Sequence, residues 1–153
     1  YIYFLSYIMK KNLFKKRKKI KINVLQCMYS LFFNDIDFNK IKYNLLLNKN
    51  FNKIDINYFN KLFNGIIKEL NLIDRYIFLY GRKKIVDIDV IELNIVRIAV
   101  FEFIFCSFIP YKIVLSEALF LSKMFGSNFG YSFVNGVLNS LVHEIKFFYK
   151  KNI

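Results

Sequence analysis

Residues that interrupt helices are scarce in this chain. Its 153 residues include one proline and five glycines, and tryptophan is absent. A β-sandwich or barrel needs many turns, and turns depend on glycine and proline. The shortage of both therefore argues against these folds and favours long helices. The chain is long enough to form one domain with a hydrophobic core.

Residues that bind metals or carry out covalent chemistry are equally few. Cys27 and Cys106 are the only cysteines, and His143 is the only histidine. This is too few for a structural zinc site, and no disulfide framework is indicated, which fits a reducing cytoplasm. The sequence also lacks a glycine loop for phosphates and a nucleophile–base pair around His143. We expect a cytoplasmic protein without a cofactor that is not an enzyme.

Long hydrophobic runs are missing as well. The apolar stretches at residues 1–9 and 98–109 are much shorter than the roughly 20 residues that span a bilayer. A secretory signal carries its charge before its apolar region, whereas here the basic run comes after it. We expect no membrane insertion. Attachment of the basic run to an anionic membrane surface is an alternative to nucleic-acid binding.

Acidic residues are outnumbered by basic ones, 11 to 24, which gives a formal net charge of +13. Eight of the cations fall between Lys10 and Lys21, with no acid among them. A basic surplus concentrated in this way indicates nucleic acid or an anionic membrane as the partner.

Apolar residues recur at helical spacing through most of the chain. The expected helices cover residues 15–33, a short segment capped by Asp35 or Asp37, a stretch from Asp55 to Gly81, residues 89–106, residues 111–125, and a last helix after a loop at 127–130. A break near residues 72–74 is left open. The sequence therefore predicts an all-α fold with about six to seven helices.

Local signals mark several of these boundaries. Asp89 with Glu92 three residues later has the spacing of a capping box, and Pro110 and Gly126 are suited to bound the next helix. Asn135-Gly136 is typical of a hairpin turn, but both flanks keep one helical period. We expect a helix there, in which Gly136 permits close packing of another helix or of a partner.

Arg97 lies within a very apolar predicted helix, so its guanidinium should be largely buried. A buried charge needs a partner. Glu117 on the next helix is the first choice for a structural ion pair, and Glu102 is the second.

The C-terminal half carries a series of motifs whose order and spacing resemble those of the NusB family, whose members carry LRIA, VPYKV, NEA and FVNGVL at these points. The corresponding segments here are VRIA at 96–99, IPYKI at 109–113, SEA at 116–118 and FVNGVL at 133–138. Upstream, QCMY at 26–29 resembles the family's QALY, and Gly65 fits its third helix. The resemblance extends from about residue 15 to residue 145.

The resemblance implies two packed helical lobes. Residues 1–14 are then expected to be a flexible N-terminal extension, 15–149 the NusB-like RNA-binding domain, and 150–153 a basic tail, with Met9 as the native start. It also implies binding of boxA-like leader RNA of ribosomal operons together with NusE, a small-subunit ribosomal protein, within the RNA polymerase antitermination complex. Some members of the family form homodimers. The alternative is a NusB-like domain of a ribosomal-RNA cytosine-5 methyltransferase, lost or cut from its catalytic domain.

The resemblance also assigns roles to residues. Glu92 corresponds to a family acid that faces NusE, although the capping box with Asp89 is a compatible local role. Tyr29 and Phe133 correspond to aromatics near the RNA, where a ring can stack on an unpaired base, and core packing is the alternative for both. The family loop before Phe133 often carries an acid that is absent here. The full set of expected RNA-binding residues is Lys15, Lys16, Arg17, Lys18, Lys19, Lys21, Tyr29 and Phe133.

Overall fold

A computed structural model describes residues 2–33, 40, 43, 44, 47, 49 and 51–151 of the chain. These residues are helical almost throughout, and no strand occurs among them, which confirms the predicted all-α class. Most of the short helix expected after Asp35 or Asp37 lies outside the described residues. The chain divides into two compact units, Tyr1–Phe63 and Asn64–Ile153.

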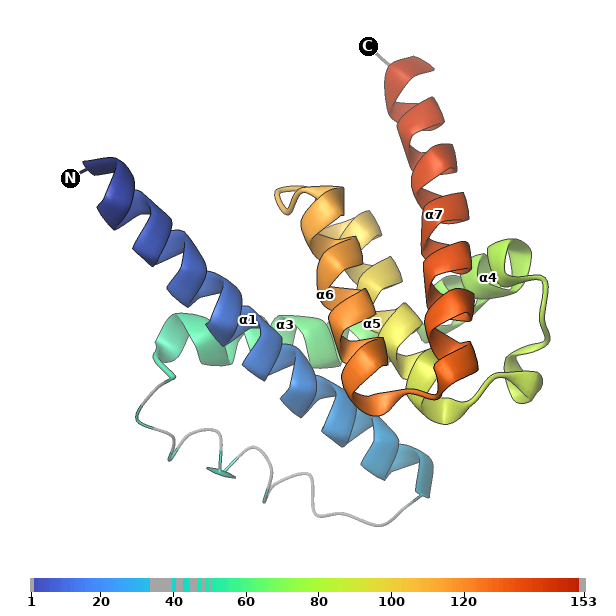
Figure 1. Ribbon diagram of the computed structural model, residues 1–153. Helices are drawn as coiled ribbons and strands as arrows, with labels where there is room; N and C mark the ends of the chain where they lie inside the picture. The colour runs from blue at the N-terminus through green and yellow to red at the C-terminus, as the bar shows by residue number, and fades with distance from the viewer. Residues whose placement is uncertain are drawn as a thin grey trace. The chain divides into compact units, whose positions relative to one another are not determined.

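The first unit contains α1, Ile2–Phe33, and most of α3, Lys53–Lys68 (Figure 1). The prediction for α1 was correct at its end but wrong at its start, which lies before residue 15. Residues 2–14 include neither proline nor glycine, so nothing in the sequence interrupts the helix there. The buried face of α1 is formed by Ile20, Lys21, Val24, Leu25, Cys27 and Met28.

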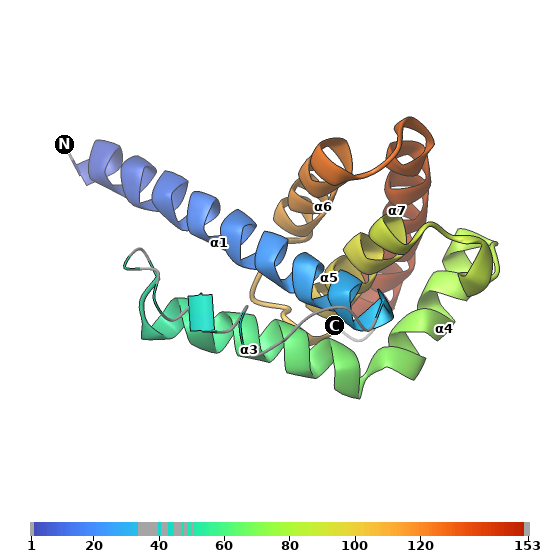
Figure 2. The same cartoon turned by 90° about the horizontal axis from the view of Figure 1, so that it is seen from below.

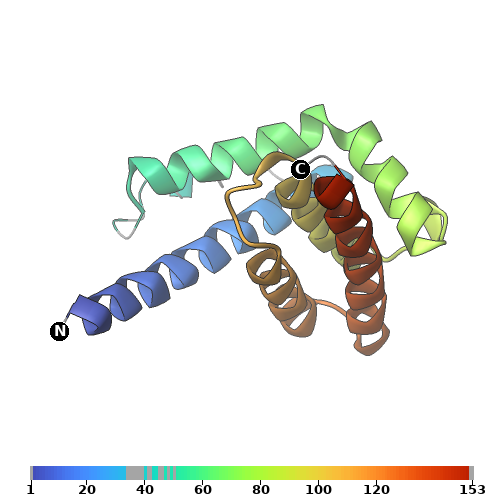
Figure 3. The same ribbon diagram turned by 90° about the horizontal axis from the view of Figure 1, so that it is seen from above.

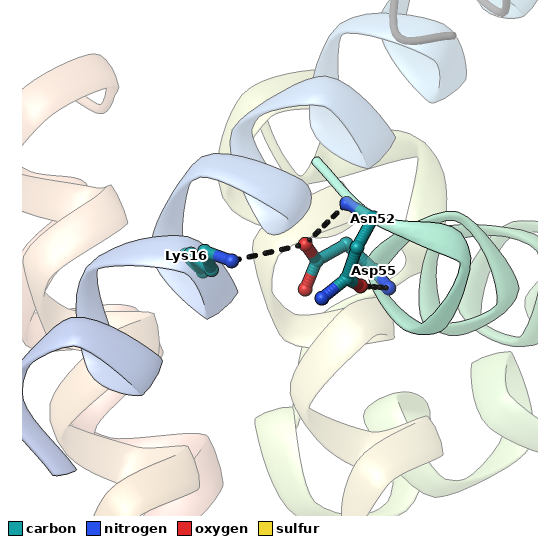
Figure 4. Close-up of polar contacts among 3 residues, drawn as sticks. All are labelled: Lys16, Asn52 and Asp55. Atoms are coloured by element: carbon teal, nitrogen blue, oxygen red, sulfur yellow. Dashed lines mark hydrogen bonds and ion pairs between the residues drawn. The ribbon is translucent and has the colours of Figure 1, made fainter. Parts of the chain in front are cut away.

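The start of α3 is stabilised by a reciprocal pair of hydrogen bonds. The Asn52 side-chain oxygen accepts from the Asp55 N–H at 3.0 Å, and an Asp55 carboxylate oxygen accepts from the Asn52 N–H at 2.9 Å (Figure 4). This is the geometry of a capping box. The cap is therefore Asn52, and Asp55, predicted as the cap, occupies the third helical position.

The second unit begins inside α3 and continues through α4, Leu70–Gly81, the short 3-10 helix η1, Ile85–Asp87, α5, Val90–Phe105, α6, Tyr111–Phe125, and α7, Asn128–Lys151. The chain bends between α3 and α4 at Glu69, so the break lies just before the range left open by the sequence (Figure 3). The loop expected at 127–130 is shorter than predicted, because α7 already begins at Asn128.

Helix α5 is the centre of the second unit and contacts α4, α6 and α7 (Figure 2). Nearly all its side chains from Glu92 to Phe103 are buried, as expected of a helix that is apolar on all sides. It begins with Asp89, whose carboxylate accepts a hydrogen bond from the Ile91 N–H at 2.8 Å. The core is completed by Ile73, Ile77, Val114, Ala118, Leu121, Val134, Val137, Leu138 and Leu141.

Two glycines of this unit differ in the room that they leave for a side chain. A Cβ at Gly65 would overlap the Phe101 ring, so α3 can approach α5 only with glycine at that position. A Cβ at Gly136 would meet nothing within 4 Å among the described residues. Gly136 is helical as predicted, but packing within the second unit does not require it.

Candidate nucleic-acid interface

The basic run of α1 does not present all its cations to solvent. Consecutive residues on a helix point about 100° apart, so six cations in a seven-residue run must face several directions. Lys15 and Lys19, one turn apart, are exposed, whereas Lys21 is only 1% exposed. We therefore leave Lys21 out of the interface. Its burial could have been foreseen, because Lys21 precedes the apolar residues Val24, Leu25 and Met28 at helical spacing.

Lys16, Arg17 and Lys18 are half-buried and engage neighbouring side chains. The Lys16 ammonium lies 3.5 Å from the Asp55 carboxylate that completes the capping box of α3 (Figure 4). The Arg17 guanidinium lies 5.6 Å from the centre of the Tyr58 ring, and the Lys18 ammonium lies 5.9 Å from that of Phe14. The last two distances are in the range of cation–π contacts. With the ion pair of Lys16, all three cations therefore contact other side chains of the first unit.

Tyr29 is 41% exposed and lies on the same face of α1 as Lys15, Lys19 and Gln26. Their spacings of four, seven and three residues place them in one stripe along the helix. The Tyr29 ring centre is 4.7 Å from that of Phe33, which is also exposed. This stripe combines cations at one end with an aromatic side chain at the other, as single-stranded nucleic-acid interfaces do.

Phe133 lies on α7 and is half-buried. The Lys83 ammonium lies 5.2 Å from the centre of its ring, and a Cβ at Gly81 would come within 3.4 Å of that ring. One part of Phe133 is therefore used for packing against the end of α4, and part remains accessible. The two roles weighed from the sequence, core packing and a nucleic-acid contact, are both compatible with this position.

Glu92 was expected at the surface, yet its side chain is 2% exposed. Its Oε1 accepts hydrogen bonds from the N–H of Ser127 at 2.7 Å and from the Ser127 hydroxyl at 2.9 Å. The carboxylate thereby holds the turn between α6 and α7. Gly130 lies close to the Glu92 carboxylate, and a Cβ at Gly130 would overlap this carboxylate. A contact of Glu92 with a partner protein remains a prediction.

Arg97 forms a structural ion pair, but not with Glu117. Its guanidinium makes two parallel bonds to Asp74 on α4, at 2.7 and 2.8 Å, and a third to the Asn94 side chain at 3.0 Å. Two parallel bonds of this kind are strong and directional. The structure thus corrects the expected pairing. Asp74 was missed because the bend at Glu69 brings α4 against α5, and no local pattern predicts that approach.

Both cysteines are buried. Burial raises the pKa of the Cys27 thiol to about 11, so the thiol stays protonated at neutral pH. Within the described ranges, no group of three or more His, Cys, Asp or Glu side chains is placed to hold a metal ion. No helix in those ranges is long and apolar enough to cross a membrane.

Comparison with known proteins places these features in a family. The sequence profile of the NusB family matches residues 18–143. The transcription antitermination protein NusB of Legionella pneumophila (strain Corby) is 33% identical over 138 residues, which cover 90% of this chain and 94% of the relative. The corresponding protein of Colwellia psychrerythraea is 35% identical over 130 residues, 85% of this chain and 94% of that protein.

Solved structures agree with the sequence comparison. The NusB of T. maritima superposes with a TM-score of 0.73 at 26% identity, over 84% of this chain and 91% of that one. A chain from a structure of antitermination factors NusB and NusE in complex with double-stranded RNA superposes with a TM-score of 0.70 at 24% identity, over 82% of this chain and 95% of that one. The profile match and the identity to curated relatives together show that this chain belongs to the NusB family.

Proposed function

We propose that this chain is a transcription antitermination factor. It binds boxA-like RNA of ribosomal operons together with NusE and suppresses termination by RNA polymerase. The proposed role is binding in the cytoplasm, not catalysis. Its main support is that the chain belongs to the NusB family and matches relatives named transcription antitermination proteins over nearly their whole length.

The exposed stripe of α1 is the surface that fits this role best. Lys15 and Tyr29 are 14 residues apart, which corresponds to about 21 Å along a helix. Lys15 and Lys19 can neutralise phosphates and release their counterions, and the exposed Tyr29 ring can stack on an unpaired base. Lys16, Arg17 and Lys18 add positive potential while holding their neighbours in the first unit.

The test is a salt series of RNA-binding titrations, read by fluorescence anisotropy of a short single-stranded RNA. Each phosphate contact contributes about 0.7 to the log–log salt slope, so Lys15→Ala/Lys19→Ala should flatten the slope by about 1.4. The matched control, Lys68→Ala/Lys112→Ala, removes the same charge from two exposed positions of the second unit. Equal effects of the two pairs, or no binding by the unaltered chain, would contradict the proposal.

A further inference from the structure

Asp55 places a fixed negative charge beside the basic run of α1. It is the only acid among the described residues of the first unit. Its Oδ2 accepts a hydrogen bond from the Asn52 N–H at 2.9 Å and lies 3.5 Å from the Lys16 ammonium, which points toward it from α1 (Figure 4). The Asp55 side chain is only 8% exposed. The capping box therefore holds this carboxylate in place, and it cannot follow the Lys16 ammonium into solvent.

Lys16 lies at the edge of the exposed stripe of α1. It comes one residue after Lys15 and three residues before Lys19, and its side chain is 40% exposed. Residues three apart on a helix are neighbours on its surface. Because the lysine side chain is long and flexible, the Lys16 ammonium can face either Asp55 or a ligand bound along the stripe.

A carboxylate and an RNA phosphate compete for the same ammonium group. Asp55 already neutralises Lys16 and relieves its repulsion from Lys19. A phosphate that contacts Lys16 must take it from Asp55, and this leaves a largely buried carboxylate without its counter-ion. Loss of the partner of a buried charge is unfavourable. Contact of RNA with Lys16 is therefore weaker than contact with a cation that has no such neighbour.

We propose that Asp55 is a built-in counter-ion that keeps Lys16 from contacting RNA phosphates and thereby limits the affinity of the first unit for RNA. The phosphates then contact Lys15 and Lys19 on the exposed stripe. Phosphate contacts carry no sequence information, so reducing their number leaves a larger share of the affinity to base contacts such as that of Tyr29. This inference rests on the proposed function and identifies Asp55 as a residue that regulates its RNA contact.

The first test removes the charge of Asp55 and keeps the helix cap. Asp55→Asn retains a side-chain oxygen that can accept from the Asn52 N–H, but it no longer attracts the Lys16 ammonium. In the same salt series, the log–log slope should steepen by about 0.7, which corresponds to an affinity gain of about fivefold at about 0.1 M salt. The gain should be equal for RNAs of different sequence. Asp87→Asn, at an exposed acid of the second unit, is the matched control and should leave the slope unchanged.

The second test separates the release of Lys16 from a general loss of negative charge. In the otherwise unaltered chain, Lys16→Ala should leave the salt slope unchanged, because Asp55 already holds this ammonium. In the Asp55→Asn background, Lys16→Ala should remove the added slope of about 0.7. A purely structural role of Asp55 would not produce this coupling. A Lys16→Ala effect on the slope that is the same in both backgrounds would overturn the proposal.

A third measurement needs no substitution, so it decides the question even if a variant does not fold. Amine-reactive labelling of the full chain, read by mass spectrometry with and without RNA, reports which ammonium groups the RNA covers. RNA should protect Lys15 and Lys19 and leave the labelling of Lys16 nearly unchanged. Protection of Lys16 as strong as that of Lys15 and Lys19 would show that Asp55 does not hold it back.

The failure of this inference can be told apart from the failure of the proposed function. If the unaltered chain binds no RNA, both are wrong. If Lys15→Ala/Lys19→Ala flattens the slope while Asp55→Asn changes neither slope nor affinity, Asp55 is only a structural partner of Lys16. In that case this inference is wrong and the proposed function stands.

Discussion

Arg97 on α5 and Asp74 on α4 form a two-bond ion pair, at 2.7 and 2.8 Å, that joins the helix after the bend to the centre of the second unit. The side chains are only 14% and 22% exposed. Exposed pairs contribute at most about 1 kcal/mol, while breaking a buried pair costs about 3–5 kcal/mol. The exposure of the Arg97–Asp74 pair is intermediate and is closer to that of a buried pair than to that of an exposed one.

Arg97→Ala should therefore lower the free energy of unfolding by about 2–3 kcal/mol, because it leaves the Asp74 carboxylate without its partner. Asp74→Ala should have a similar effect, and a double-mutant cycle should show strong coupling between the two. Arg75→Ala, at an exposed neighbour on α4, is the control and should change stability by less than about 0.5 kcal/mol. A melting temperature of Arg97→Ala equal to that of the control would show that the pair is not stabilising.

Two glycines of α7 should respond in opposite directions to the same substitution. Gly130→Ala places a Cβ where the buried Glu92 carboxylate lies, so it should destabilise the protein by about 1–3 kcal/mol. Gly136→Ala meets open space and should stabilise it by up to about 1 kcal/mol, through better helix propensity. Thermal or urea unfolding of both variants makes the comparison. A stabilising Gly130→Ala would mean that Glu92 does not hold the α6–α7 turn.

The effect of replacing a cation of α1 should depend on whether its side chain is exposed or buried. Lys15→Ala should weaken RNA binding with little change in stability, because the side chain is exposed. Lys21→Ala should instead destabilise the fold, because Lys21 is only 1% exposed and its removal would leave a cavity in the buried face of α1. Melting curves and salt-dependent binding of both variants test this division. It is wrong if Lys21→Ala keeps its stability and flattens the salt slope.

The Cys27 thiol should be inert in the folded protein. Burial raises its pKa from 9.0 to about 11, so thiolate should form only in strongly alkaline solution. Alkylation at pH 8 should be slow, and fast after denaturation. The thiol ionises at lower pH in the unfolded chain than in the folded protein. Stability is therefore fully retained below pH 9.0, and the free energy of unfolding falls as the pH rises toward about 11. Rapid labelling of Cys27 in the native protein would contradict this.

Local signals in the sequence were enough to locate the helices of the second unit. Asp89, Pro110 and Gly126 each mark a boundary that the structure confirms. The bend at Glu69 has no proline or glycine beside it, so no local signal in the sequence marks its position. The capping box at Asn52 was shifted by one turn in the prediction, because Asn52 and Asp55 are both good caps when considered alone.

The sequence predicted the type of the candidate site, but not which of its residues are exposed. The basic run and Tyr29 indicated where a nucleic acid would bind, but periodicity had to be applied to each cation to exclude Lys21. Glu92 looked like a surface acid because its partner, Ser127, lies 35 residues away. A contact between distant segments decided the case of Glu92, whereas helical spacing alone decided that of Lys21.

The most direct test of the antitermination function is equilibrium binding of boxA-like and scrambled RNA by the full chain, with and without the host's NusE. The proposed function predicts weak, salt-sensitive binding of both RNAs by the chain alone. Adding NusE should then raise the affinity for boxA-like RNA and widen its advantage over the scrambled sequence. If NusE changes neither the affinity nor the discrimination, the chain is a general RNA-binding protein and the proposed function is wrong.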